Sequence, residues 1–204
     1  MCALSACRRV KHALALALCL VTGAAGADSW SNPLPRAYAS PTGLRVVRVI
    51  PGTDKGAVLG YQGAPRGAPA RAIVYRLNTG GDYAKSTEFE LLNPISPMFA
   101  AVSDNGELIT LDNWHNMGIG ESVVVVYSPQ GRVVRSLGLA IIYSAEELAK
   151  LPLSVSSIWW RCGSDAELHP RSPKLEFMDA LGSSVEISLK TGEVTRSPSS
   201  RKGC

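Results

Sequence analysis

Histidine, aromatic residues and recognisable catalytic motifs are all scarce in this sequence. The 204 residues contain three histidines, and aromatic residues make up 6% of the chain. The H-E-x-x-H pattern of zinc metalloproteases does not occur, and neither does the G-x-S-x-G turn of α/β-hydrolases. Gly118-Ile119-Gly120 lacks the third glycine of a dinucleotide-binding fingerprint. These absences exclude the enzyme classes that the motifs mark, and we expect neither a cofactor nor a bound metal.

A marked excess of positive charge is also absent beyond residue 27. The chain has 21 Lys and Arg against 17 Asp and Glu, but Arg8, Arg9 and Lys11 lie in the first 27 residues, so 18 cations remain against 17 acids. A nucleic-acid-binding protein carries a basic stripe with interleaved aromatic residues. Because no such stripe occurs here, we expect no nucleic-acid partner.

Residues 1–27 have the three zones of a secretory signal peptide. A basic start precedes an apolar run at Ala13–Val21, and the segment ends in the A-x-A site Ala25-Gly26-Ala27. The run is about half the roughly 20 residues that a membrane span needs. The pattern predicts cleavage between Ala27 and Asp28, a periplasmic or secreted location, and no membrane span after cleavage.

Two related signals fit less well. Lipidation of Cys19 would need a small residue before the cysteine, where Leu18 stands. Arg8-Arg9 has the wrong flanking residues for a twin-arginine signal. After cleavage only Cys162 and Cys204 remain, in a compartment where disulfides persist. They are a possible disulfide; the alternative is that Cys162 is a buried small residue and Cys204 is unpaired.

The remaining chain is expected to be all-β. We predict an irregular lead-in at residues 28–43, a single β-rich domain at 44–196 and a flexible tail at 197–204. Short apolar runs separated by turn residues predict three four-stranded antiparallel meanders. Their strands are expected at 44–50, 57–62, 72–77 and 88–92; at 98–103, 107–111, 122–127 and 132–137; and at 156–160, 174–178, 184–189 and 193–195. This repeat length is typical of propeller blades, although a sandwich also fits.

Two segments of this pattern are distinctive. The run Ser122–Tyr127 (SVVVVY) is apolar on both faces, which predicts a central strand buried on both sides. Ser144 and Glu147 form a capping-box pattern, which predicts one short helix near 144–151. In Trp159-Trp160, adjacent residues of a strand face opposite sides, so we expect one tryptophan in the core and the other as a cover.

The loop Asp112–Glu121 (DNWHNMGIGE) is the most unusual segment. Together with its flanking strands, and with the stretch SVSSIWWR at 154–161, it resembles segments of exported bacterial β-rich proteins that share a DNWH-x-x-G-x-G loop. The resemblance covers about 45 of the residues that follow the leader. It implies propeller-like blades and brings no known activity, so it supplies no catalytic residues.

The loop has two physical interpretations. In the first, Asp112, Asn113, Trp114 and His115 form a binding site, and Asp112 and His115, with His169, could serve a metal or exchange protons. In the second, Asp112 and Asn113 bond to turn amides, Trp114 plugs the sheet edge, and the glycines adopt positive φ. We favour the second because a metal site normally needs three or four ligands, and His115 is the one strong ligand here.

The sequence is therefore interpreted as an exported, non-enzymatic binding module of the cell envelope, with an unknown ligand. Its partner would be a protein or another envelope component, bound through loops on one face. One alternative is a small exported hydrolase or metal-dependent enzyme that uses Asp112 and His115. Another is a purely structural domain.

The position of the leader gives a direct prediction. Because the A-x-A site follows a nine-residue apolar run, the mature protein should begin at Asp28. Intact-mass measurement of protein isolated from the cell exterior or envelope checks this. A mass that retains residues 1–27, or that includes acyl chains on Cys19, would contradict it.

Overall fold

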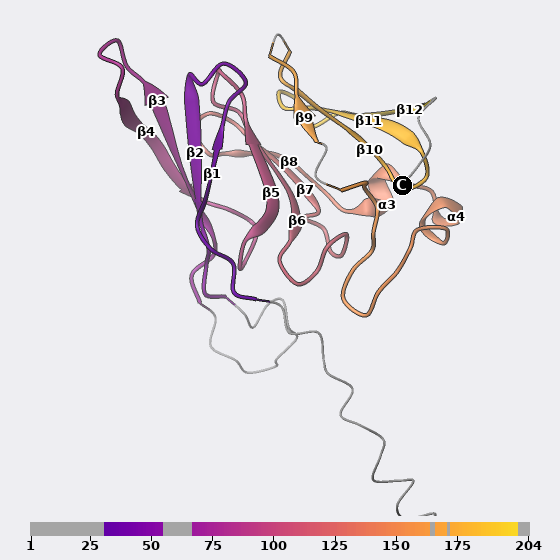
Figure 1. Ribbon diagram of the computed structural model, residues 1–204. Helices are drawn as coiled ribbons and strands as arrows, with labels where there is room; N and C mark the ends of the chain where they lie inside the picture. The colour runs from indigo at the N-terminus through magenta and orange to yellow at the C-terminus, as the bar shows by residue number, and fades with distance from the viewer. Residues whose placement is uncertain (1–30, 55–66, 164–165, 171, 200–204) are drawn as a thin grey trace, which may run out of the picture. The chain divides into compact units, whose positions relative to one another are not determined.

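In the part of the chain that the structure describes, twelve strands form three four-stranded antiparallel sheets, each a meander of neighbouring strands (Figure 1). The computed structural model describes residues 31–54, 67–163, 166–170 and 172–199. Within these residues the protein is all-β, as the sequence predicted, and it also contains two short helices. The predicted strand at 57–62 lies outside the described residues.

The first sheet has the order β1-β2-β3-β4. Its strands are β1 (Arg36–Ala39), β2 (Arg45–Ile50), β3 (Arg71–Leu77) and β4 (Tyr83–Glu90). Strand β1 corrects the sequence prediction, which placed these residues in an irregular lead-in. The flanking prolines obscured a strand that pairs with β2 and brings Tyr38 opposite Val47. The Tyr38 ring also makes an edge-to-face contact with Phe99, at 5.9 Å between centroids.

The second sheet is the centre of the core. Its strands are β5 (Pro97–Val102), β6 (Leu108–Asn113), β7 (Val124–Tyr127) and β8 (Val133–Leu137). All four residues of β7 are buried, which confirms the predicted central strand. Val125 and Tyr127 pack against the first sheet, whereas Val124 and Val126 pack with residues of the third. Alternate side chains of β7 therefore pack in two separate apolar clusters, which explains why this strand has no polar face.

The third sheet begins later in the chain than the sequence predicted. Its strands are β9 (Glu167–Leu168), β10 (Lys174–Met178), β11 (Ser183–Ser188) and β12 (Val194–Pro198). The segment 156–160, expected to be its first strand, makes one isolated bridge between Leu153 and Ile158. Strand β12 also includes residues 197 and 198, which were assigned to the flexible tail, because they pair with β11.

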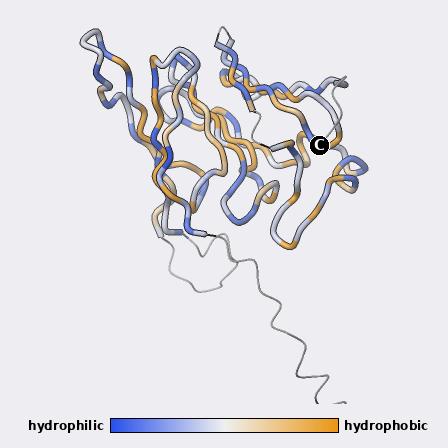
Figure 2. Tube along the Cα trace, in the orientation of Figure 1, coloured by the Kyte–Doolittle hydropathy of each residue, from blue (hydrophilic) through white to orange (hydrophobic). Residues whose placement is uncertain are grey.

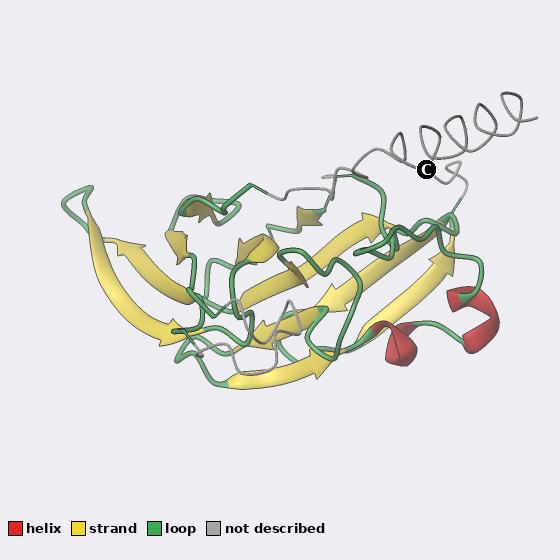
Figure 3. Cartoon of the chain, turned by 90° about the horizontal axis from the view of Figure 1, so that it is seen from below, coloured by secondary structure: helices red, strands yellow, loops and turns green. Residues whose placement is uncertain are grey.

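Two short helices follow the second sheet, where the sequence predicted one (Figure 3). Helix α3 spans Leu139–Ile142 and was not predicted, because a single turn is too short to show a helical period. Helix α4 spans Ala145–Leu148, and Ser144 and Glu147 form the predicted capping box. Leu151, beyond the end of α4, is buried in the larger apolar cluster.

The outer face of the third sheet is more polar than the interior of the protein. Figure 2 shows apolar residues concentrated in the central strands. On the third sheet, Leu175, Phe177, Val185 and Ile187 face the core, and the residues that alternate with them are polar apart from Met178. Lys174 forms an ion pair with Glu186 at 2.5 Å on that alternate face. The face of the third sheet that is turned away from the core is therefore solvated.

The buried central strand leads to a stability prediction. Val124→Asp places an unpaired charge between two sheets, which should cost on the order of several kcal/mol, comparable to the whole stability of a domain. Val133→Asp on β8, at a site that is 46% exposed, should change stability by less than about 0.5 kcal/mol. Thermal and urea unfolding of both variants measure the difference. Equal effects would mean that β7 is not enclosed on both sides.

Candidate functional site

Asp112 is the penultimate residue of β6 and is completely buried. The sequence placed it in a loop, but it belongs to the strand and has a positive φ of 61°. One carboxylate oxygen, Oδ1, accepts hydrogen bonds from the Gly118 amide at 2.9 Å and the Trp160 indole at 2.7 Å. The other, Oδ2, accepts from Arg161 Nε at 2.9 Å. Both oxygens are thus engaged by the protein itself.

Trp160 and Arg161 extend this contact to the third sheet. The carbonyl of Trp160 accepts hydrogen bonds from the Ala180 amide at 3.0 Å and the Tyr143 hydroxyl at 3.3 Å. The Trp160 ring meets Phe177 of β10 edge-to-face, with centroids 5.2 Å apart. The Arg161–Asp112 pair is enclosed, with side-chain exposures of 9% and 0%. One dipeptide therefore joins the end of β6 to the third sheet.

The glycine at position 118 is required by the close approach of these segments. Its φ is +72°, and a Cβ there would lie 2.6 Å from the carbonyl oxygen of Ile158. The neighbouring Met117 carbonyl accepts a hydrogen bond from the Ile158 amide at 2.8 Å. The loop 114–121 and the segment 152–161 are consequently held side by side. These are the two stretches that carry the resemblance to exported β-rich proteins.

A second polar contact fixes the other side of this strand end. The side-chain amide of Asn93 donates to Asn113 Oδ1 at 2.8 Å and to the Asp112 carbonyl at 3.2 Å. The Thr110 hydroxyl donates to Asn93 Oδ1 at 3.1 Å. Asn113 is thereby committed to a buried network, because its side-chain oxygen already has a donor.

Trp114 and His115 lie in different surroundings although they are adjacent. Trp114 is buried, its amide donates to the Ser96 carbonyl at 2.8 Å, and Arg36 lies 5.5 Å from its ring centroid. His115 is partly exposed and has a φ of 72°, a left-handed conformation in which Asn, Asp and His are enriched. This backbone conformation accounts for the presence of a histidine at this position.

His169 contacts a different carboxylate. Its Nε2 lies 3.0 Å from Glu176 Oε2 of the third sheet. In the part of the chain that the structure describes, no group of three or more His, Cys, Asp or Glu residues is arranged to hold a metal ion. The Sγ of Cys162 lies 3.3 Å from the Asp179 carbonyl oxygen. Its predicted partner Cys204 lies outside the described residues, so the disulfide stays a prediction.

The segment 152–160 exposes three apolar side chains, of which the sequence analysis had singled out Trp159 but not Leu153 or Val155. Leu153 is 69% exposed, Trp159 is 52% exposed and Val155 is fully exposed; we call these three residues the apolar tip. The tip is ordered, because the Trp159 amide donates to the Pro152 carbonyl and the Ser154 amide to the Ser157 carbonyl, both at 2.8 Å. Trp160 is completely buried, so the two tryptophans divide into core and surface as expected.

The tip and its support could be recognised only in part from sequence. The run from Pro152 to Trp160 (PLSVSSIWW) has no charged residue, which is a visible signal. By contrast, the partners of Asp112 are 48 and 49 positions away, and no local pattern links them. The loop that follows α4 extends away from the strands in Figure 1, and Figure 2 shows apolar residues at its end.

Comparison with known proteins yields little. No protein-family model matches the chain, and no curated protein is significantly similar to it. Among solved structures, the chain is similar to the periplasmic gluconolactonase PpgL of Pseudomonas aeruginosa, with 13% identity and a TM-score of 0.33. The alignment covers 78% of this chain and 40% of the gluconolactonase. A likeness at this level identifies neither the fold nor an activity.

Within the described residues, no helix is long and apolar enough to cross a membrane.

Asp112→Asn tests the buried ion pair. Asparagine tolerates the positive φ and retains an oxygen for Trp160, so the substitution chiefly removes the charge opposite Arg161. Leaving a buried guanidinium uncompensated should reduce the free energy of unfolding by about 3–5 kcal/mol. The measurement is urea denaturation.

The control for this variant is Glu146→Gln, which breaks an exposed ion pair with Lys150. That change should stay within about 0.5 kcal/mol of the parent. If Asp112→Asn also cost less than about 1 kcal/mol, the pair would behave as an exposed one.

Proposed function

We propose that this chain is an exported, non-enzymatic binding module that attaches to a protein or other component of the cell envelope through the apolar tip. Export rests on the leader at residues 1–27. The predicted disulfide between Cys162 and Cys204 would suit the same oxidising compartment. The observation that carries the proposal is the exposure of Leu153, Val155 and Trp159 on one ordered segment.

Three exposed apolar side chains on one uncharged segment need a reason. Single apolar residues on a surface are ordinary, but several of them close together in the chain are typical of an interaction site. Covering side chains of this size contributes about 1.5–3 kcal/mol each, and tryptophan is enriched among residues that dominate binding energy. The tip is therefore suited to a partner surface that is itself apolar or uncharged.

The support beneath the tip favours binding over catalysis. Ile158 and Trp160, on either side of Trp159, are held by Met117 and Asp112 of the neighbouring loop. Because the segment is fixed before it meets a partner, little conformational freedom is lost on association. Asp112 is the carboxylate that the alternative enzyme would use. Both of its oxygens accept hydrogen bonds from Gly118, Trp160 and Arg161 in this support.

Val155→Asp tests the proposal. The side chain is fully exposed, so the substitution should leave the melting temperature unchanged while it places a charge at the centre of the tip. We expect the variant to bind isolated envelopes of the producing organism at least roughly tenfold more weakly than the parent in co-sedimentation. Protease treatment of the envelopes distinguishes a protein partner from other envelope components.

Val134→Asp is the matched control, because it adds the same charge at an exposed valine of the second sheet. It should leave envelope binding unchanged. Binding that is unaffected by Val155→Asp, or reduced equally by both variants, would remove the tip from the function.

A further inference from the structure

Two arginines stand directly opposite each other in the first sheet. Arg45 of β2 is the cross-strand partner of Arg76 of β3. Like charges in this position destabilise a sheet. Burial and repulsion by Arg76 lower the pKa of the Arg45 guanidinium below its ordinary value. The pair is therefore a cost to the fold that some other interaction must offset.

The surroundings supply polar groups but no compensating carboxylate. Arg45 Nη1 donates to the Ser86 hydroxyl at 3.2 Å, and its Nε donates to the backbone carbonyl of Asp104 at 3.3 Å. The Asp104 carboxylate instead accepts from the Thr42 hydroxyl at 2.7 Å. Among the described residues, no Asp or Glu forms an ion pair with either arginine.

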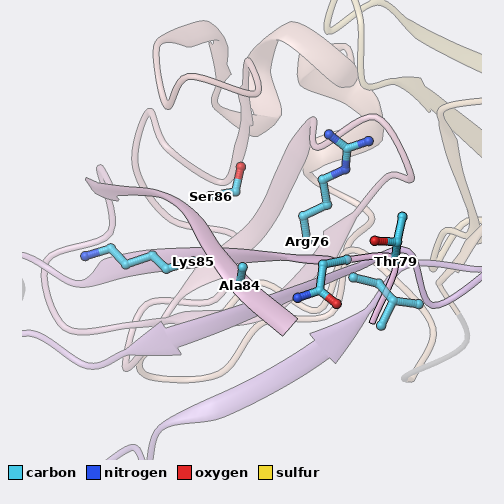
Figure 4. A pocket seen from close by; sticks show the side chains of 7 residues that line it. Arg76, Thr79, Ala84, Lys85 and Ser86 are labelled. Atoms are coloured by element: carbon cyan, nitrogen blue, oxygen red, sulfur yellow. The ribbon is translucent and has the colours of Figure 1, made fainter. Parts of the chain in front are cut away.

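An open pocket of about 400 Å³ lies beside this pair, at the turn between β3 and β4. It is lined by Arg76, Leu77, Asn78, Thr79, Ala84, Lys85 and Ser86. In Figure 4, Arg76 and Ser86 extend to the same side of the hairpin, whereas Lys85 extends away from them. Lys85 is moreover paired with Glu88 at 2.5 Å.

The pocket is rich in hydrogen-bond donors. Asn78 Oδ1 already accepts from the amides of Gly80 and Asp82, both at 2.9 Å, so its amide group remains as a donor. Arg76 contributes a planar fork of N–H groups, which matches the oxygens of a phosphate or a carboxylate. Ser86 links the pocket to Arg45, because it lines the pocket and also accepts from that arginine.

We propose that this pocket binds an oxyanion, the phosphate or carboxylate group of a ligand, with Arg76 as its principal charged donor and Arg45 and Ser86 behind it. The anion supplies a negative charge to two arginines that form no ion pair with the described residues. This site lies on the first sheet, and its existence does not depend on binding through the apolar tip.

Titration of the purified protein with inorganic phosphate at low ionic strength tests the proposal, followed by amide chemical shifts. Phosphate should shift residues of the β3–β4 hairpin, and Arg76→Gln should weaken binding at least roughly tenfold, the loss of one charge-assisted bond. Arg132→Gln removes the same charge at an exposed site on another hairpin and should have no effect. Acetate, titrated in parallel, shows whether carboxylate or phosphate is preferred.

Thermal unfolding provides an independent readout. Without anion, Arg76→Gln should melt at a higher temperature than the parent, because the repulsion with Arg45 is relieved. Added phosphate should raise the melting temperature of the parent and of Arg132→Gln, but not that of Arg76→Gln. Equal stabilisation of all three proteins, or no shift at the hairpin, would overturn the proposal.

Discussion

The buried carboxylate of Asp112 is the contact on which the arrangement of loops and sheets depends. It accepts from a turn amide, an indole and a guanidinium, and these donors come from two segments far apart in the chain. A buried charge is tolerated only where such partners are complete, so the three donors must arrive together. When all three donors are bound to Asp112, the end of β6, the loop after it and the segment beneath the apolar tip are fixed relative to one another.

The middle sheet provides the setting for that contact. Its strands alternate between two apolar clusters, one shared with the first sheet and one with the third. Apolar packing holds the sheets together but is not directional. The polar contacts of Asp112 and Asn113 fix the orientation of the segments that meet at the end of β6, since each hydrogen bond has a narrow range of allowed geometry.

Local patterns in the sequence predicted the local features. Four consecutive valines indicated a strand with two buried faces, and Ser144 with Glu147 indicated the capped helix, because periodicity and capping act over a few residues. Strand β1 was missed, since its pairing with β2 matters more than its own composition. The segment 156–160 looked like a strand, but its tryptophan is held by a carboxylate 48 residues away. The Arg45–Arg76 pair likewise becomes visible only when the register of β2 and β3 is known.

The polar outer face of the third sheet has a consequence for how many such sheets can stack. Each added sheet must present an apolar face to its neighbour, as the middle sheet does on both sides. The surface with Lys174, Glu176 and Glu186 offers charges and an existing ion pair instead. Another sheet packed on this surface would have to desolvate these charged groups. The free energy of that desolvation exceeds what apolar contact would contribute. The outer face of the third sheet is thus unsuited to packing another sheet, as the polar outer face of an end repeat is in a solenoid.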